Sequence, residues 1–218
     1  LRLRSVRLRL QGPFMNILII ASGASASRIK FREDQLLIMA INRMVERFRA
    51  DINVAADAEA SRMMHWPRPQ YAITCSKGLK ETPPHVLAVP GAETVFDLGG
   101  GPGVYTNLLT GAFAAHIACM WLAETQHGGG VYLAGYDQGG ARAIEDGRDH
   151  SSPFYGADPS KSPFQHYSKY ATVKIQTVNG NGALPFIDAG SRVPDGIAVD
   201  KPAAARNLLN WLSKKYGC

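Results

Sequence analysis

The sequence predicts an α/β fold: one Rossmann-like domain with a mostly parallel sheet, helices on both faces and a long lid segment. Short apolar runs alternate with helical patterns from Met15 onward, an order that requires crossover connections between parallel strands. The first run, 16–21, is apolar on both faces, as central strands of parallel sheets are. With 45% hydrophobic content in 218 residues, the chain can bury a core and is not disordered.

The expected elements follow in chain order. Buried runs predict strands at 16–21, 36–41, 52–56, 71–74, 86–89, 94–98 and 131–134, and a short last strand at 184–187. The best helix has apolar residues at three- and four-residue spacing from Tyr105 to Trp121, with His116 on the apolar stripe as a core residue. A short helix pattern covers 42–49, an ambiguous helix 168–178 and an amphipathic helix 202–216. We find no internal repeat or linker, so residues 15–218 are expected to form a single domain.

Residues 138–168 interrupt this rhythm. They combine Gly, Pro, Ser and Asp with scattered aromatic residues and show no period. A segment of about 30 residues without regular structure is unusual in a compact domain and often serves as a lid or binding loop. We therefore expect a lid here.

The first fourteen residues carry much of the net charge of +6. Four of the 24 Lys and Arg residues are Arg2, Arg4, Arg7 and Arg9, and the other 20 stand against 18 acidic residues. Residues 1–14 are expected to be a non-native or flexible basic arm, because the first methionine, Met15, directly precedes the first strand. A basic arm for nucleic acid or anionic lipid is the alternative. Since residues 15–218 are not notably basic, we do not expect a nucleic-acid partner.

Membrane insertion and disulfide chemistry are not expected. No apolar run reaches the roughly 18 to 20 residues that cross a bilayer, and no long apolar stretch of a signal peptide follows the arginines. The three cysteines, Cys75, Cys119 and Cys218, are too few and too scattered for a disulfide framework or a tetrahedral zinc site. This usage is typical of a reduced, cytoplasmic compartment.

The turn after the first strand is the first candidate site. Small residues at 21–25, between a buried strand and a helix, would let backbone N–H groups approach a phosphate at the amino end of that helix. The alternative is a tight turn between strand and helix without a ligand.

A glycine-rich segment at 93–103 is the second candidate site. Its sequence, Glu-Thr-Val-Phe-Asp-Leu-Gly-Gly-Gly-Pro-Gly, resembles the first motif of Rossmann-fold methyltransferases, which holds S-adenosylmethionine. That family has an acidic strand end roughly 20 positions later, whereas here the next one, Asp137, lies 40 residues after Asp97. A methyltransferase is therefore kept as an alternative function.

The third candidate is an ordered set of short motifs. Gly23-Ala24-Ser25 follows the first strand, Asn42 the second and Asp57 the third, Thr110-Gly111 opens the long helix, and Gly135-Tyr136-Asp137 follows the strand at 131–134. This order resembles the bacterial sialyltransferases that use a CMP-activated sugar. It is also similar to Rossmann-like proteins related to the archaeal hydroxymethylpterin diphosphokinases, common in phage and surface-polysaccharide loci. The resemblance covers roughly residues 15–192.

The resemblance implies a role for each matching position in binding the nucleotide. Gly23, Ala24 and Ser25 would line the phosphates, although Ser22, Ala24 and the lack of a proline depart from the family's turn. Asn42 would contact the nucleotide, and Thr110 with Gly111 would hold the base or ribose. Gly135 and Asp137 match the family's glycine-x-aspartate pair.

The resemblance further implies two catalytic residues in the lid. Tyr155 would stabilise the leaving phosphate, and His166 would act as general base. A neutral imidazole suits the removal of a proton from an attacking hydroxyl near pH 7, and a phenol O–H can stabilise a departing phosphate without a metal. The alternative for His166 is an ordinary loop histidine.

Asp57 and Glu59 are candidate ligands for a divalent cation such as Mg²⁺. The acid-x-acid form follows a strand, where a nucleotide-sugar enzyme would hold its metal, but a solvated helix start explains it equally well. The expected function is transfer of a group, most simply a sugar, from a nucleotide-activated donor to a glycan or other hydroxyl acceptor. A methyltransferase and a non-catalytic structural or nucleotide-binding module are the alternatives, and a homo-oligomer stays open.

Overall fold

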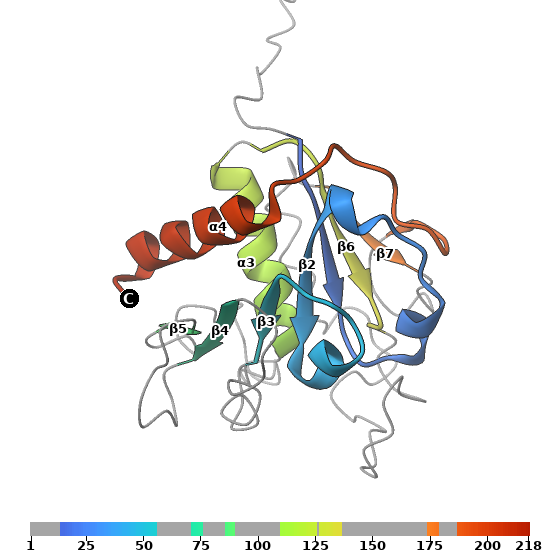
Figure 1. Ribbon diagram of the computed structural model, residues 1–218, viewed down its shortest axis with the longest axis horizontal. Helices are drawn as coiled ribbons and strands as arrows, with labels where there is room; N and C mark the ends of the chain where they lie inside the picture. The colour runs from blue at the N-terminus through green and yellow to red at the C-terminus, as the bar shows by residue number, and fades with distance from the viewer. Residues whose placement is uncertain are drawn as a thin grey trace, which may run out of the picture.

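The computed structural model describes residues 14–55, 71–75, 86–89, 110–125, 127–136, 174–178 and 187–218. These residues form an eight-stranded sheet in which each strand is parallel to its neighbours (Figure 1). The strands are β1 (Asn16–Ile20), β2 (Leu36–Ile41), β3 (Ile52–Val54), β4 (Tyr71–Cys75), β5 (Val86–Val89), β6 (Gly130–Ala134), β7 (Lys174–Val178) and β8 (Ile187–Asp188). The predicted α/β fold with a parallel, Rossmann-like sheet is confirmed.

The strand order is β5-β4-β3-β2-β1-β6-β7-β8. The chain runs outward from β1 to β5 and then returns to the other side of β1, where β6 begins the second half of the sheet. Ile20 therefore lies beside Ala40 of β2 and beside Ala134 of β6. At the start of β1, the Asn16 side-chain oxygen accepts a hydrogen bond from the N–H of Gly130 at 3.1 Å. The reversal of strand order thus falls between β1 and β6.

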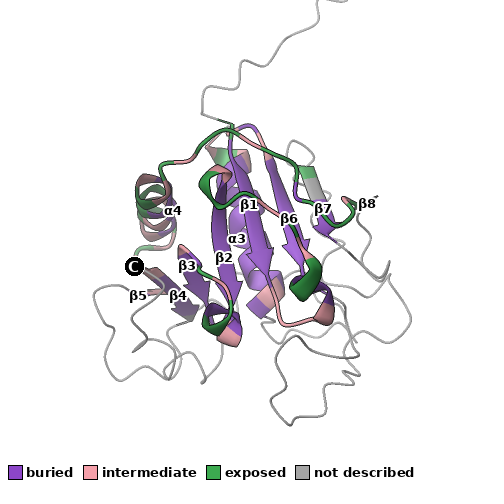
Figure 2. Ribbon diagram, turned by 45° about the vertical axis from the view of Figure 1, so that its right-hand side comes forward, coloured by how far each residue is buried: buried purple, intermediate pink, exposed green. Residues whose placement is uncertain are grey.

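Both faces of the sheet are covered by helices. Ile17 and Ile19 of β1 pack in the core beneath α3 (Thr110–Glu124) and α4 (Lys201–Tyr216). Leu18 and Ile20 join the opposite core, which includes residues of the 3₁₀-helices η1 (Ala24–Arg28) and η3 (Asn42–Glu46). A third 3₁₀-helix, η2, spans Glu33–Gln35. Figure 2 shows the central strands buried between these two layers, as the all-apolar run predicts.

Helix α3 is buried around almost its whole circumference. His116 on the predicted stripe is 5% exposed, and residues between the stripe positions, such as Ala114 and Ala118, are fully buried as well. The spacing therefore predicts the helix correctly but not its environment, because an amphipathic helix would leave one side in water. Thr110–Glu124 is a central helix of this fold.

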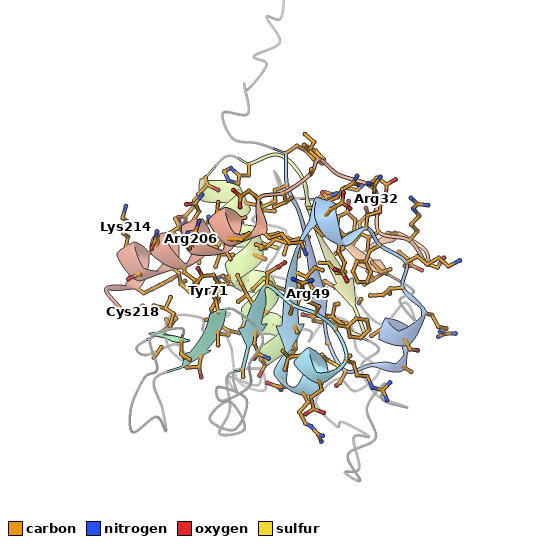
Figure 3. All side chains as sticks on the ribbon, in the orientation of Figure 1. Arg32, Arg49, Tyr71, Arg206, Lys214 and Cys218 are labelled. Carbon is orange, nitrogen blue, oxygen red and sulfur yellow. The ribbon has the colours of Figure 1, made fainter. Side chains whose placement is uncertain are left out.

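Helix α4 matches the predicted amphipathic helix to within one residue at its start. The Asp200 side chain accepts a hydrogen bond from the N–H of Ala203 at 3.1 Å, as an N-cap residue does. Leu208 and Leu212 are buried, whereas Arg206 and Lys214 lie on the outer face (Figure 3). The Trp211 indole N–H and the Lys215 ammonium both donate to the Glu124 carboxylate and so attach α4 to the end of α3.

Two predicted elements differ from the structure. The ambiguous helix at 168–178 is wrong for its described part, because 174–178 form β7, which pairs along its length with β6. Its sequence, Lys-Ile-Gln-Thr-Val, is rich in β-branched residues, which favour strands. The helix pattern at 42–49 is realised only as the 3₁₀-helix η3 over 42–46.

Several predicted features lie outside the described residues: the arm up to residue 13, the strand at 94–98 and the lid at 138–168. Residue 14, the last of the predicted arm, is described, and its Phe14 side chain is 45% exposed. Among the described helices, none has the length and apolar character to cross a membrane.

Candidate functional site

The carboxyl ends of β1 and β6 form the candidate site. In open parallel sheets, ligands bind in the crevice outside the carboxyl ends of the strands, at the point where the strand order reverses. Here that point lies between β1 and β6, which are paired from Ile17 with Val131 to Ile20 with Ala134. The turns that follow the two strands, 21–25 and 135–136, therefore lie side by side.

These two turns are joined by two hydrogen bonds of the Gly135 backbone. The Gly135 carbonyl accepts from the N–H of Gly23 at 2.8 Å, and the Gly135 N–H donates to the Ser25 hydroxyl oxygen at 3.1 Å. Gly135 has φ +73°, and a Cβ atom there would lie 2.0 Å from the Ala21 carbonyl oxygen. Only glycine fits this crossing, because both the backbone conformation and the space exclude a side chain.

The same bonds change what the turn after β1 can offer a ligand. The Gly23 N–H, predicted to approach a phosphate, is already bonded to Gly135, and the 2% exposed Ser25 accepts from Gly135. The helix after this turn is the five-residue 3₁₀-helix η1. A phosphate contact by Gly23, Ala24 or Ser25 stays a prediction, and two of these residues also hold the site together.

The start of α3 lies against the turn after β6. The Tyr136 hydroxyl donates to the Gly111 carbonyl oxygen at 3.0 Å. A Cβ atom at Gly111 would lie 2.9 Å from ring carbon Cε1 of Tyr136, so glycine makes room for the ring. Thr110, the first residue of α3, is 8% exposed. Thr110 and Gly111 are thereby brought to the site that contains Gly23, Ala24, Ser25 and Gly135.

Asn42 lies at the same edge of the sheet, directly after β2. Asn42 follows Ile41, the last residue of β2, and β2 pairs with β1 up to Ala40 beside Ile20. Asn42 has φ +48°, and no other non-glycine residue of the described part has a positive φ. Its side-chain oxygen Oδ1 is buried and, in the described part of the chain, has no hydrogen-bond partner. A buried polar atom without a partner is costly and points to an unfilled role.

Positive charge is placed on the turns that border this edge. Arg28 ends η1, and Arg43 directly follows Asn42. The Arg43 guanidinium is paired with the Glu46 carboxylate at 2.9 Å, whereas Arg28 is exposed. Cations near a binding edge favour an anionic ligand through their field, without needing direct contact.

The thiols of Cys119 and Cys218 are poor candidates for a nucleophile. Cys119 lies within α3 with no exposed surface, and burial raises the pKa of its thiol far above the ordinary value. Burial also raises the pKa of Cys218 at the carboxyl end. Because the thiolate is the reactive form, a raised pKa disfavours reaction of both thiols at neutral pH.

Five of the predicted site residues and one predicted motif lie outside the described residues. These are Asp137, Tyr155 and His166, the proposed metal ligands Asp57 and Glu59, and the glycine-rich segment at 93–103. In the part of the chain that is described, no group of three or more His, Cys, Asp or Glu side chains is placed to hold a metal ion. The roles of all these residues stay predictions.

Two residues of the site were missed by the sequence reasoning. Tyr136 lies between the two residues of the Gly135-x-Asp137 motif and joins β6 to α3. Asn53 is a polar residue inside the buried run Ile52-Asn53-Val54, and its side chain reaches the turn at Asn42. A lone amide within a buried apolar strand is the signal that would have singled out Asn53, because buried polar groups need a partner.

Comparisons of this chain with protein-family models, with curated proteins and with solved structures give no match. The relation to the sialyltransferases stays a prediction from the order of the motifs. The parallel sheet and its reversal between β1 and β6 show a Rossmann-like fold and do not test that relation.

Proposed function

We propose that this protein binds a nucleotide at the carboxyl edge of the sheet, between β1 and β6, as the activated donor of a group-transfer reaction. One observation carries the proposal: residues expected at a nucleotide site from separate parts of the sequence meet where the strand order reverses. Gly23, Ala24, Ser25, Thr110, Gly111 and Gly135 belong to the connected turns, and Asn42 is one strand away.

The polar character of this edge supports the proposal. A nucleotide presents an anionic phosphate together with hydroxyl and N–H groups on the ribose and base. Arg28 supplies positive charge, whereas Arg43 is paired with Glu46. The Oδ1 of Asn42, which has no partner among the described residues, supplies an acceptor. Binding sites of this kind are held by a small number of placed polar groups on a rigid frame.

The donor is proposed to be a nucleotide sugar. An acceptor hydroxyl oxygen would attack the anomeric carbon, its proton would pass to the imidazole of His166, and the bond to the nucleotide phosphate would break with its electron pair leaving on the phosphate oxygen. Tyr155 would donate a hydrogen bond to that oxygen as its charge develops. Removing a general base lowers turnover by about a hundredfold or more.

A panel of ligands tests the proposal by thermal shift. CMP, UDP, GDP, ATP and S-adenosylmethionine are each added to the native protein at increasing concentration. A ligand at 100 times its Kd stabilises the folded state by about 2.7 kcal/mol, or roughly 5–11 °C for a chain of this size. A shift with S-adenosylmethionine alone would favour the methyltransferase, and no shift with any ligand would contradict the proposed site.

Gly23→Val locates the binding site. Gly23 has φ −64° and ψ 153°, which valine adopts without strain, so the variant is expected to fold. The branched side chain should reduce the nucleotide shift by filling the approach to the turn. Ser27→Val, on the exposed side of η1, is the matched control and should keep the shift. Turnover of nucleotide sugars by native protein and by His166→Ala then tests catalysis, and a native rate in the variant would remove His166 as base.

A further inference from the structure

A buried asparagine of β3 supports the turn at Asn42. Ile52 and Val54 belong to the core beneath α3, so the side chain of Asn53, which lies between them, points to the opposite face. Asn53 is 2% exposed, and its side-chain Nδ2 donates a hydrogen bond to the backbone carbonyl of Asn42 at 3.0 Å. The bond crosses from β3 to the carboxyl end of the neighbouring strand β2.

The residue that Asn53 holds is in a strained conformation. Asn42 has φ +48°, which lies in the left-handed region. Residues other than glycine adopt this backbone conformation at a cost in free energy. Asparagine tolerates this region better than most residues, yet glycine would fit it without strain. The presence of an asparagine therefore indicates that its side chain has a use, and that use is not met within the described residues because Oδ1 has no partner there.

We propose that Asn53 is a positioning residue of the nucleotide site: its bond to the Asn42 carbonyl holds Asn42 in the left-handed conformation and so keeps Oδ1 as an acceptor for a ligand. This inference rests on the proposed function, which places the nucleotide at this edge. An amide oxygen accepts but cannot donate, so its partner must be an O–H or N–H group. The subsite at the end of β2 therefore receives the ribose hydroxyls or the base amine, and the phosphates lie elsewhere.

The experiment compares two buried amides. Asn53→Ala removes the donor to Asn42, and Gln176→Ala removes another buried strand amide, on β7, whose Oε1 also lacks a partner in the described residues. Both truncations leave a small cavity, so both lower stability. CMP affinity is measured for each folded variant, together with amide hydrogen exchange in residues 42–46, which reports local opening of η3.

Asn53→Ala is expected to weaken CMP binding about tenfold, the scale of one hydrogen bond to a ligand, and to speed exchange in η3 by a similar factor. Gln176→Ala should change both by less than about twofold, because β7 is separated from β2 by β6 and β1. Native CMP affinity in folded Asn53→Ala would overturn the proposal.

Changes at Asn42 separate the backbone from the acceptor. Asn42→Gly should keep the fold, because glycine adopts φ +48° freely, but it should lose CMP affinity because Oδ1 is absent. Pyrophosphate, which presents no base or ribose, should bind the native protein and Asn42→Gly equally. Comparison of CMP with 2′-deoxy-CMP decides whether the ribose 2′-hydroxyl is the donor.

Failure of the inference can be told apart from failure of the proposed function. If CMP and the other nucleotides do not bind the native protein, the nucleotide site is refuted, and the acceptor role of Asn42 with it. The hydrogen-exchange comparison still judges whether Asn53 holds the turn, because it needs no ligand. Unchanged exchange in η3 of Asn53→Ala would refute that role whatever the binding result.

Discussion

Gly135→Ala tests whether the two turns of the candidate site are joined as described. An alanine at φ +73° costs about 1–2 kcal/mol, because left-handed backbone is unfavourable for side chains with a Cβ. The new Cβ would also lie 2.0 Å from the Ala21 carbonyl oxygen, so the backbone must move. That movement breaks the bonds of Gly135 with Gly23 and Ser25, at about 1 kcal/mol each. The expected loss of stability is therefore about 3–4 kcal/mol.

Gly190→Ala is the matched control for this change. Gly190 has nearly the same backbone conformation, φ +76°, but a Cβ atom there meets nothing within 4 Å. This variant should lose only the conformational part, about 1–2 kcal/mol. The difference of about 2 kcal/mol is the contribution of the contact between the turns.

Urea unfolding followed by tryptophan fluorescence and far-ultraviolet circular dichroism measures both variants. If the two variants have the same slope of the unfolding transition, the difference between their midpoints reports a difference in the free energy of unfolding. At the level of melting temperature, the two variants should differ by about 4–8 °C for a chain of this size. Equal destabilisation of the two, to within about 0.5 kcal/mol, would show that Gly135 does not lie against Ala21.

Two further predictions concern other contacts. Gly111→Ala should fail to give the gain of about 1 kcal/mol that alanine usually brings to a helix, because its Cβ would press on the Tyr136 ring at 2.9 Å; the gain should appear in a Tyr136→Ala background, and a stabilised single variant in urea unfolding would contradict the contact. For His127, burial lowers the pKa, outweighing a smaller opposing effect of a backbone hydrogen bond near Thr125. The folded state thus binds the proton less well than the unfolded chain, and stability should fall as the pH drops from the ordinary histidine pKa of about 6.5 through the lower native pKa. His127→Phe, which keeps a ring against Trp121, should flatten this part of the pH profile, and an unchanged profile would remove His127 as its source.

The sheet could be predicted because the apolar composition of its strands indicates that they are buried. Ile17, Leu18, Ile19 and Ile20 are apolar at every position, a pattern that fits only a strand covered on both faces. The strand at 174–178 was missed because Lys174, Gln176 and Thr177 interrupt the apolar run, and its pairing with β6 is a non-local contact that local sequence does not report.

At the candidate site, the motifs predicted which residues gather but not what each does there. The Gly23 N–H and the Ser25 hydroxyl are used to bind Gly135, which lies 110 residues further along the chain from Ser25. Likewise, Gly111 leaves room for the ring of Tyr136, a contact that the spacing of the motifs does not reveal. Such partners belong to the tertiary structure, and no spacing rule along the chain reveals them.

The position of β1 between β2 and β6 has a consequence for synthesis of the chain. β2 follows β1 after fifteen residues, but the N–H of Gly130 that bonds Asn16 comes from a residue 114 positions later. At a translation rate of roughly 5–20 residues per second, that edge of β1 waits about 6–23 s for its partner strand. Throughout that time the unpaired N–H and carbonyl groups of an apolar strand can form hydrogen bonds with other chains. The nascent protein is therefore expected to depend on chaperone binding, or on rapid translation up to β6. A protein whose central strand pairs early would depend on these less.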